Sequence, residues 1–95
     1  MINDSINFSW DDVKNKQLKT DRGLCFEDFV IQANQDNILD IIKHPNSTKY
    51  SNQHIYIVEL QGYVCMVPCV KSEAGVFLKT IIPSRKMQKK YREAK

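Results

Sequence analysis

Hydrophobic and polar positions along the chain change their spacing near residue 38. Before this point, apolar residues recur at helical spacing, most clearly at Phe26, Phe29, Val30 and Ala33. These positions are i, i+3, i+4 and i+7 of one helical face. After residue 38, apolar residues alternate with polar ones or form short β-branched runs, which are typical of strands. The pattern therefore predicts an α+β domain, with helices first and most of the sheet after them.

The N-terminal part is predicted to hold one short strand and two helices. Residues 7–10 form a short segment with two aromatic side chains, Phe8 and Trp10, which is consistent with an edge strand. Ser9 and the acidic residue three positions later loosely resemble a capping box, and this places the first helix start near Trp10. Gly23 is a plausible stop for that helix. The second helix is predicted from about Phe26, with acidic residues in its first turn where the helix dipole favours them.

Four further strands and a final helix are predicted after the second helix. The dipeptide Gln61-Gly62 predicts a tight hairpin. Pro68 cannot donate to a ladder, so its strand should have a free edge or a bulge there. The predicted order is β-α-α-β-β-β-β-α, a mainly antiparallel sheet of about four strands with helices packed on one side, in one domain over residues 1–95. The four strands after the helices are predicted at 38–43, 54–60, 63–70 and 76–82.

Charge is distributed unevenly along the chain. Residues 84–95 carry six basic side chains and one acidic, whereas the rest carries eight basic and ten acidic. A basic segment of this kind favours an anionic partner, and nucleic acid is the first candidate. A solvated tail is the alternative. Met87 and Tyr91 lie four apart, on one face of a helix, which favours a placed cationic surface.

Composition narrows the class of protein. At 42% hydrophobic and 26% charged residues, the chain is typical of a folded domain. It contains no apolar stretch of membrane-spanning length and no signal-peptide pattern, so we expect a cytoplasmic protein with no membrane partner. Three cysteines fit reduced thiols. A glycine-rich phosphate loop, a carboxylate pair at metal spacing and a zinc-ligand set are all missing, which predicts no metal and no other cofactor.

Three groups of residues carry a resemblance to a known family. The sequence resembles the BrnT-like toxins of bacterial type II toxin–antitoxin systems, which share the RelE/ParE fold, and the match spans most of the chain. The groups are similar to the family patterns F-x-W-D-x-x-K-N, H-G-I-x-F-E, and R-x-I-S-A-R with a downstream tyrosine. In this chain they are Phe8-x-Trp10-Asp11 with Lys14-Asn15, Arg22-Gly23-Leu24-x-Phe26-Glu27, and Lys79-Thr80-Ile81-Ile82-Pro83-Ser84-Arg85-Lys86 with Tyr91.

The resemblance implies a small RelE/ParE-like domain acting as a metal-independent endoribonuclease, an mRNA interferase. Such a toxin cleaves messenger RNA, free or on the ribosome, blocks translation, and is neutralised by a cognate antitoxin protein. Two departures keep alternatives open: Arg22 replaces the family's histidine, and Lys79 replaces the strand arginine. The alternatives are a non-catalytic toxin that binds a protein target such as DNA gyrase, and a non-toxic nucleic-acid-binding domain.

Most candidate catalytic residues are cations near the strand-to-helix turn. Arg22, on or just after the first helix, is a further candidate because it could line the same cleft as Arg85. Arg85, beside Ser84, could grip a phosphate bidentately and stabilise the charge that develops during RNA cleavage. Lys79 interrupts an apolar strand, so it is either a site cation or an edge lysine that opposes aggregation. The predicted catalytic set is Arg85, Lys79, Arg22 and Ser84.

The general acid and base are left open by the sequence. His44 and His54 are the two imidazoles, and both stand at ordinary structural positions. A lysine would serve as base only with a lowered pKa. Tyr91 could stack on a base or pin the last helix to the sheet. The predicted RNA-binding residues are Lys14, Lys19, Lys86, Lys89, Lys90 and Tyr91.

Overall fold

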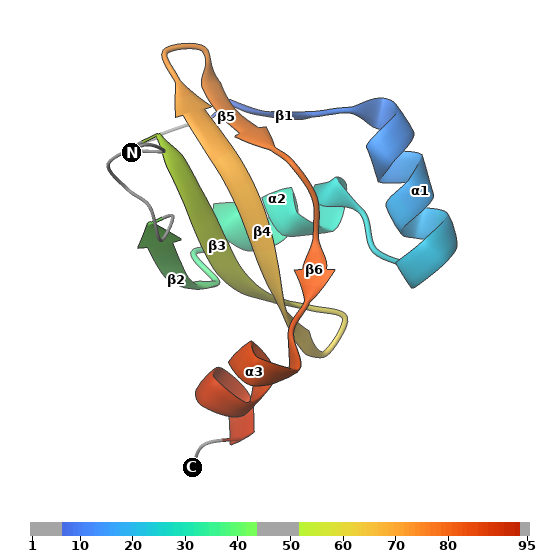
Figure 1. The fold of residues 1–95 in the computed structure, drawn as a ribbon, viewed down its shortest axis with the longest axis vertical. Coiled ribbons are helices and arrows are strands. Elements are labelled where there is room, and N and C mark those ends of the chain that lie inside the picture. The colour runs from blue at the N-terminus through green and yellow to red at the C-terminus, as the bar shows by residue number, and fades with distance from the viewer. Residues whose placement is uncertain (1–6, 44–51, 94–95) are drawn as a thin grey trace.

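A computed structural model describes residues 7–43 and 52–93, and it has the predicted α+β architecture (Figure 1). The polar loop predicted after residue 43 lies mostly outside these ranges. The elements are β1 (Phe8–Trp10), α1 (Asp12–Arg22), α2 (Phe26–Asn34), β2 (Ile38–Lys43), β3 (Gln53–Leu60), β4 (Tyr63–Ser72), β5 (Gly75–Leu78), β6 (Ile82–Pro83), α3 (Arg85–Gln88) and the π-helical turn η1 (Lys89–Glu93).

The described strands form one sheet in the order β1-β5-β4-β3-β2, with β6 also paired to β4. The pairings of β2, β3, β4, β5 and β6 are antiparallel, as predicted. The pairing of β1 with β5 is parallel, so the sheet is mixed. The prediction of about four strands is wrong, because the sheet has six and the stretch predicted as one strand over 76–82 is divided between β5 and β6.

The parallel pairing of β1 with β5 depends on a glycine. The Val76 N–H donates to the Asn7 carbonyl at 3.0 Å. A Cβ atom on Gly75 would lie 2.2 Å from that same carbonyl oxygen, and the φ angle of Gly75 is +136°. An L side chain is strained at this φ and has no room here, so only glycine lets the two strands approach.

The ends of α1 are set by local side-chain and backbone bonds. The prediction that this helix begins near Trp10 is wrong: Trp10 belongs to β1, and α1 begins at Asp12. The Asp11 carboxylate caps the helix by accepting from the Val13 N–H at 2.9 Å, which is the role assigned to Ser9 in the prediction. The helix stops at Gly23 as predicted, with a left-handed φ of 67°.

The hairpin predicted at Gln61-Gly62 joins β3 to β4, and both residues have positive φ (53° and 82°). These values are those of a type I′ turn. The Gln61 side chain donates through Nε2 to the Gly23 carbonyl at 2.8 Å, so the hairpin is tied to the end of α1.

Pro68 lies inside the sheet and not at a free edge, but the alternative prediction of a bulge agrees with the register: three residues, 79–81, stand opposite two, 67–68, between the pairs Cys69–Leu78 and Met66–Ile82. It faces Ile55 in the regular β3–β4 ladder. Its carbonyl accepts from the Lys79 N–H at 2.9 Å, on the side of β4 away from β3. The proline nitrogen points to that same side. On that side β5 ends at Leu78 and β6 begins only at Ile82. The proline, which has no backbone N–H, therefore lies where no ladder bond is needed.

Helices lie on both faces of the sheet. On the back face, α1 and α2 cover the core, which contains Phe26 and Phe29 and the inward side chains of β3, β4 and β5. The front face is the opposite one, and α3 with η1 lies against it through Glu59, which alternates with the back-face residue Val58. The prediction that all helices pack on one side is wrong for α3, because Ile57, fully buried on the front face, also needs cover. None of the described helices has the length and apolar character needed to cross a bilayer.

Candidate nucleic-acid interface

The basic C-terminal segment is held against the sheet from its first residue. Ser84 is the N-cap of α3, and its Oγ accepts from the Met87 N–H at 3.2 Å. Gln88 Oε1 accepts from the Val64 N–H of β4 at 2.9 Å. This bond satisfies a buried backbone donor with a helix side chain, so the helix takes a fixed place instead of forming a loose tail.

Two further contacts hold η1 to the strands. Tyr91 donates its hydroxyl to Asp40 Oδ2 of β2 at 2.6 Å, and Arg92 Nε lies 3.0 Å from Glu59 Oε1 of β3. The Tyr91 bond, followed by a bond from the backbone of Ile41, lowers the pKa of Asp40, and the same bond raises the pKa of Tyr91. The pair is therefore a charged carboxylate and a neutral phenol at neutral pH. Of the two roles considered for Tyr91, this geometry supports the structural one, in which Tyr91 attaches the last helix to the sheet.

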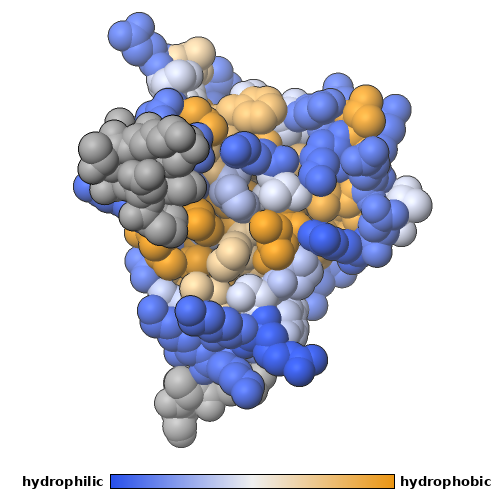
Figure 2. All heavy atoms as spheres, viewed as in Figure 1, coloured by the Kyte–Doolittle hydropathy of each residue, from blue (hydrophilic) through white to orange (hydrophobic). Residues whose placement is uncertain are grey.

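Five cations on α3 and η1 are exposed, and Arg92 is the one paired to Glu59. The other four are Arg85, Lys86, Lys89 and Lys90, and none of them pairs with a carboxylate among the described side chains of residues 7–43 and 52–92. Lys90 Nζ lies 5.4 Å from the centroid of the Tyr91 ring, a cation–π distance. Their charges are thus left to water or to an anionic ligand. Figure 2 shows this hydrophilic end of the molecule below the apolar middle of the front face.

Lys79 faces the same side of the sheet as α3. Its N–H extends the β4–β5 ladder, and strand alternation sets it on the face of Phe77, opposite the buried Leu78. Phe77 is 43% exposed, and Ile82, also on this face, is 37% exposed. The front face therefore presents exposed apolar side chains next to Lys79 and the basic helix, as the pale and orange band in Figure 2 indicates.

Arg22 lies in the other layer. Its Nη1 donates to the Ile81 carbonyl at 2.6 Å. It borders a hollow of about 340 Å³ together with the back-face residues Leu60 and Cys65. Lys14 and Lys19 lie on α1, the helix that packs on the back face through its buried Leu18. The structure thus places Ser84, Arg85, Lys86, Lys89, Lys90, Tyr91 and Lys79 on the front side of the sheet. Arg22 reaches the segment just before Ser84, through the Ile81 carbonyl and the hollow that it borders with Pro83. Lys14 and Lys19 stay on α1 in the back layer.

The described front face contains no imidazole. His54 pairs with the buried Cys69 on the back face, and His44 lies outside the described residues. Cys69 and Cys65 are buried thiols, and burial raises the pKa of Cys65 to about 11. No group of three metal-ligating side chains occurs in the described part of the chain. Any chemistry at the front face must therefore be argued from its cations.

The sequence analysis missed the residues that position α3. These are Gln88 on the helix itself and two strand carboxylates, Asp40 and Glu59. A signal for the carboxylates was present, because each is the single acidic residue of a strand that is otherwise largely apolar. An acidic side chain in such a strand stands out as a possible partner for the basic segment, which supplies hydroxyl and guanidinium donors.

Comparison with known proteins adds no relative: no family model, curated protein or solved structure matches this chain.

Proposed function

We propose that the protein is the toxin component of a type II toxin–antitoxin system with a RelE/ParE-like fold, a metal-independent endoribonuclease that binds messenger RNA on its front face. The observation that carries the proposal is the seating of α3. Contacts through Gln88, Tyr91 and Arg92 fix the helix to the sheet, while its other cations stay exposed on the face of the sheet that also carries Lys79. Fixed cations at spaced positions suit a phosphate backbone. The catalytic part of the proposal comes from the resemblance in the sequence.

Cleavage of RNA without a metal places extra negative charge on the phosphorus as the 2′-hydroxyl attacks. Preorganised cations stabilise that charge, and this is usually the largest contribution to such a reaction. We assign this role to Arg85, which can donate bidentately to phosphate oxygens, and a supporting role to Lys79. Ser84, whose hydroxyl caps α3, positions Arg85 by fixing the start of the helix.

A second candidate is RNA binding without cleavage. It is favoured by one observation: the described front face holds no imidazole, and Arg22, at the position of the family's histidine, donates to the Ile81 carbonyl. A toxin that binds a protein target such as DNA gyrase is a third reading. It predicts growth arrest with DNA-damage signalling and intact RNA.

Replacing Arg85 by alanine is expected to abolish growth arrest when the protein is induced in bacteria. Removing one charge-stabilising donor costs about a hundredfold or more in cleavage rate. The measurement is growth together with mapping of cellular RNA 5′ ends. New ends in the wild type that disappear with Arg85→Ala would support the ribonuclease.

Lys16→Ala is the control, because it removes one positive charge from α1, on the back of the sheet. It should keep cleavage, provided that circular dichroism shows both variants folded. Equal loss of RNA ends in Lys16→Ala would move the reacting site away from α3. Arrest with intact RNA in the wild type would favour the protein-target reading, and absence of arrest would leave RNA binding alone.

The exposed apolar side chains beside the cations suggest how the antitoxin binds. We propose that an acidic amphipathic segment of the antitoxin covers Phe77 and Ile82 and pairs with the basic helix, because both features lie on one face. Since Pro68 lies inside the sheet, it offers this segment no free strand edge. Co-expression with the product of the neighbouring gene should restore growth in the same assay. Unrelieved arrest with a soluble partner would contradict the assignment.

The double variant Lys86→Ala/Lys89→Ala is expected to weaken binding of single-stranded RNA and to reduce its dependence on salt. Each lost phosphate contact lowers the slope of log K against log salt by about 0.7, so two contacts lower it by about 1.4. Fluorescence anisotropy across a salt series measures this slope with 2′-O-methyl oligonucleotides, which cannot undergo 2′-hydroxyl attack.

Lys16→Ala/Lys19→Ala, on α1, makes the same change in net charge in the other layer. It should leave the slope nearly unchanged. Equal slopes for the two double variants would show that the protein attracts RNA through its net charge and not through α3.

A further inference from the structure

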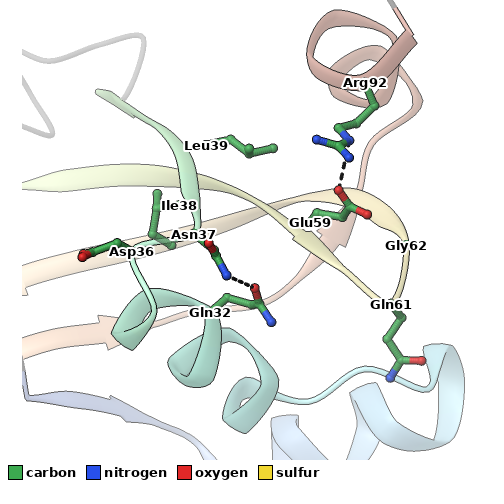
Figure 3. Close-up of a pocket in the computed structure, with 9 residues that line it drawn as sticks. All are labelled: Gln32, Asp36, Asn37, Ile38, Leu39, Glu59, Gln61, Gly62 and Arg92. Atoms are coloured by element: carbon green, nitrogen blue, oxygen red, sulfur yellow. Dashed lines mark hydrogen bonds and ion pairs between the residues drawn. The ribbon is translucent and has the colours of Figure 1, made fainter.

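A polar pocket of about 470 Å³ lies next to the basic helix. Its walls come from the end of α2, the start of β2, the β3–β4 turn and η1, as Figure 3 shows. The volume is within the range of small-molecule sites in proteins. Arg92 belongs both to this pocket and to the segment that carries Lys89 and Lys90, so a ligand on that segment has direct access to the pocket.

Three carboxamides line the pocket, and each makes a hydrogen bond that holds it in place. Asn37 donates through Nδ2 to Gln32 Oε1 at 3.1 Å, and Gln61 donates through Nε2 to the Gly23 carbonyl at 2.8 Å. These bonds leave the Gln32 amide nitrogen, the Asn37 amide oxygen and the Gln61 amide oxygen without partners among the described residues. The pocket thus offers both donors and acceptors whose positions are fixed.

Charge in the pocket disfavours a phosphate. Asp36 and Glu59 outnumber the single cation Arg92, which is already paired to Glu59 at 3.0 Å. The Arg92 side chain is 49% exposed and offers one flat guanidinium face, and Leu39 adds an apolar wall. A neutral, planar group with hydrogen-bonding edges fits these surroundings, and an anion does not.

We infer that this pocket binds a nucleobase of the RNA whose phosphates contact α3, and that it prefers cytosine or adenine to uracil. The exocyclic amino groups of cytosine and adenine donate to carboxylate and amide oxygens, and Glu59 and Asn37 supply such acceptors. Uracil carries a carbonyl in place of the amino group, so it sets an acceptor oxygen against these acceptors, and its one donor, N3–H, lies at a different place on the edge. The inference rests on the proposed RNA binding and adds the base preference.

The test compares 2′-O-methyl oligomers of cytidine and uridine. The two bases differ at the edge that carries the amino group or the carbonyl, and in both oligomers neighbouring bases stack weakly. The wild type should bind the cytidine oligomer about tenfold more tightly, which corresponds to one good base contact. Glu59→Gln, which keeps the shape but removes the charge, should bring the ratio of the two affinities close to one, and Asn37→Ala should lower it. Lys86→Ala should weaken both oligomers equally and keep the ratio.

The possible outcomes separate the proposed RNA binding by α3 from the proposed base pocket. Salt-dependent binding with equal affinity for both oligomers would overturn the base pocket and leave RNA binding by α3 in place. A wild-type preference that persists in both folded pocket variants would also overturn it, because the preference would arise elsewhere. Failure of the folded wild type to bind either oligomer at low salt would overturn the proposed function, and the base pocket with it.

Discussion

Replacing Phe29 by alanine is expected to lower the free energy of unfolding by about 3–5 kcal/mol. Phe29 is fully buried, and its ring contacts two others: Phe8 at 5.3 Å edge-to-face and Tyr56 at 5.2 Å. The substitution leaves a cavity between α2 and β3 and removes the aromatic contact that helps to hold β1. A domain of this size has only about 5–15 kcal/mol in total, so the variant should be close to unfolding.

Urea denaturation followed by circular dichroism measures this loss. The control is Phe77→Ala, the same change at a front-face position that is 43% exposed, and it should cost less than about 1 kcal/mol. Similar losses at the two positions would contradict the division between a back-face core and an open front face.

Replacing Asn15 by alanine is expected to lower the free energy of unfolding by about 2–3 kcal/mol. Asn15 lies on α1 and is 5% exposed, yet it caps the next helix: its Oδ1 accepts from the Phe26 N–H at 2.8 Å. The N-cap residue of α2, Cys25, supplies no side-chain bond of its own. Removing the Asn15 amide leaves the Phe26 donor buried without a partner.

A pH titration separates this capping role from simple packing. Asn15 Nδ2 donates to Glu27 Oε1 at 2.8 Å, and this bond is the main cause that lowers the pKa of Glu27 from its ordinary value of 4.5. The resulting stabilisation is present above pH 4.5 and is lost as the pH falls through the folded-state pKa. Asn15→Ala should raise the pKa of Glu27 toward 4.5, measured by NMR, and the stability gap to the wild type should narrow in acid. An unchanged pKa would contradict the bond.

The sequence predicted those parts of the fold that depend on near neighbours in the chain. The stripe beginning at Phe26 defined α2, Gly23 ended α1, and Gln61-Gly62 formed the hairpin, because each signal acts over a few residues. The partner of β1 could not be predicted, since a three-residue strand has no pattern that selects a neighbour. The interior place of Pro68 also depends on a gap between two other strands.

The sequence predicted which charged residues are candidates for the site. It did not predict which face of the sheet each of them lies on. The basic run defined Arg85 and its neighbours, and the strand lysine Lys79 lies on their side. Arg22 directly precedes Gly23 in the sequence, and its contact with the segment before Ser84 depends on how α1 packs against the sheet. Which face a helix covers depends on the full packing of the domain, and single-sequence patterns contain little of that information.

The parallel pairing of β1 with β5 bears on how the protein is made. The first described strand has its partner about seventy residues later, so these seventy residues must leave the ribosome before β1 can pair. Until Val76 and Leu78 emerge, β1 has no strand partner and can pack only through its side chains, against Phe29 and Phe26 of α2. The segment that carries the exposed cations follows directly after these residues. During synthesis, therefore, the closed domain and its basic surface form almost together, once the residues after β5 have emerged.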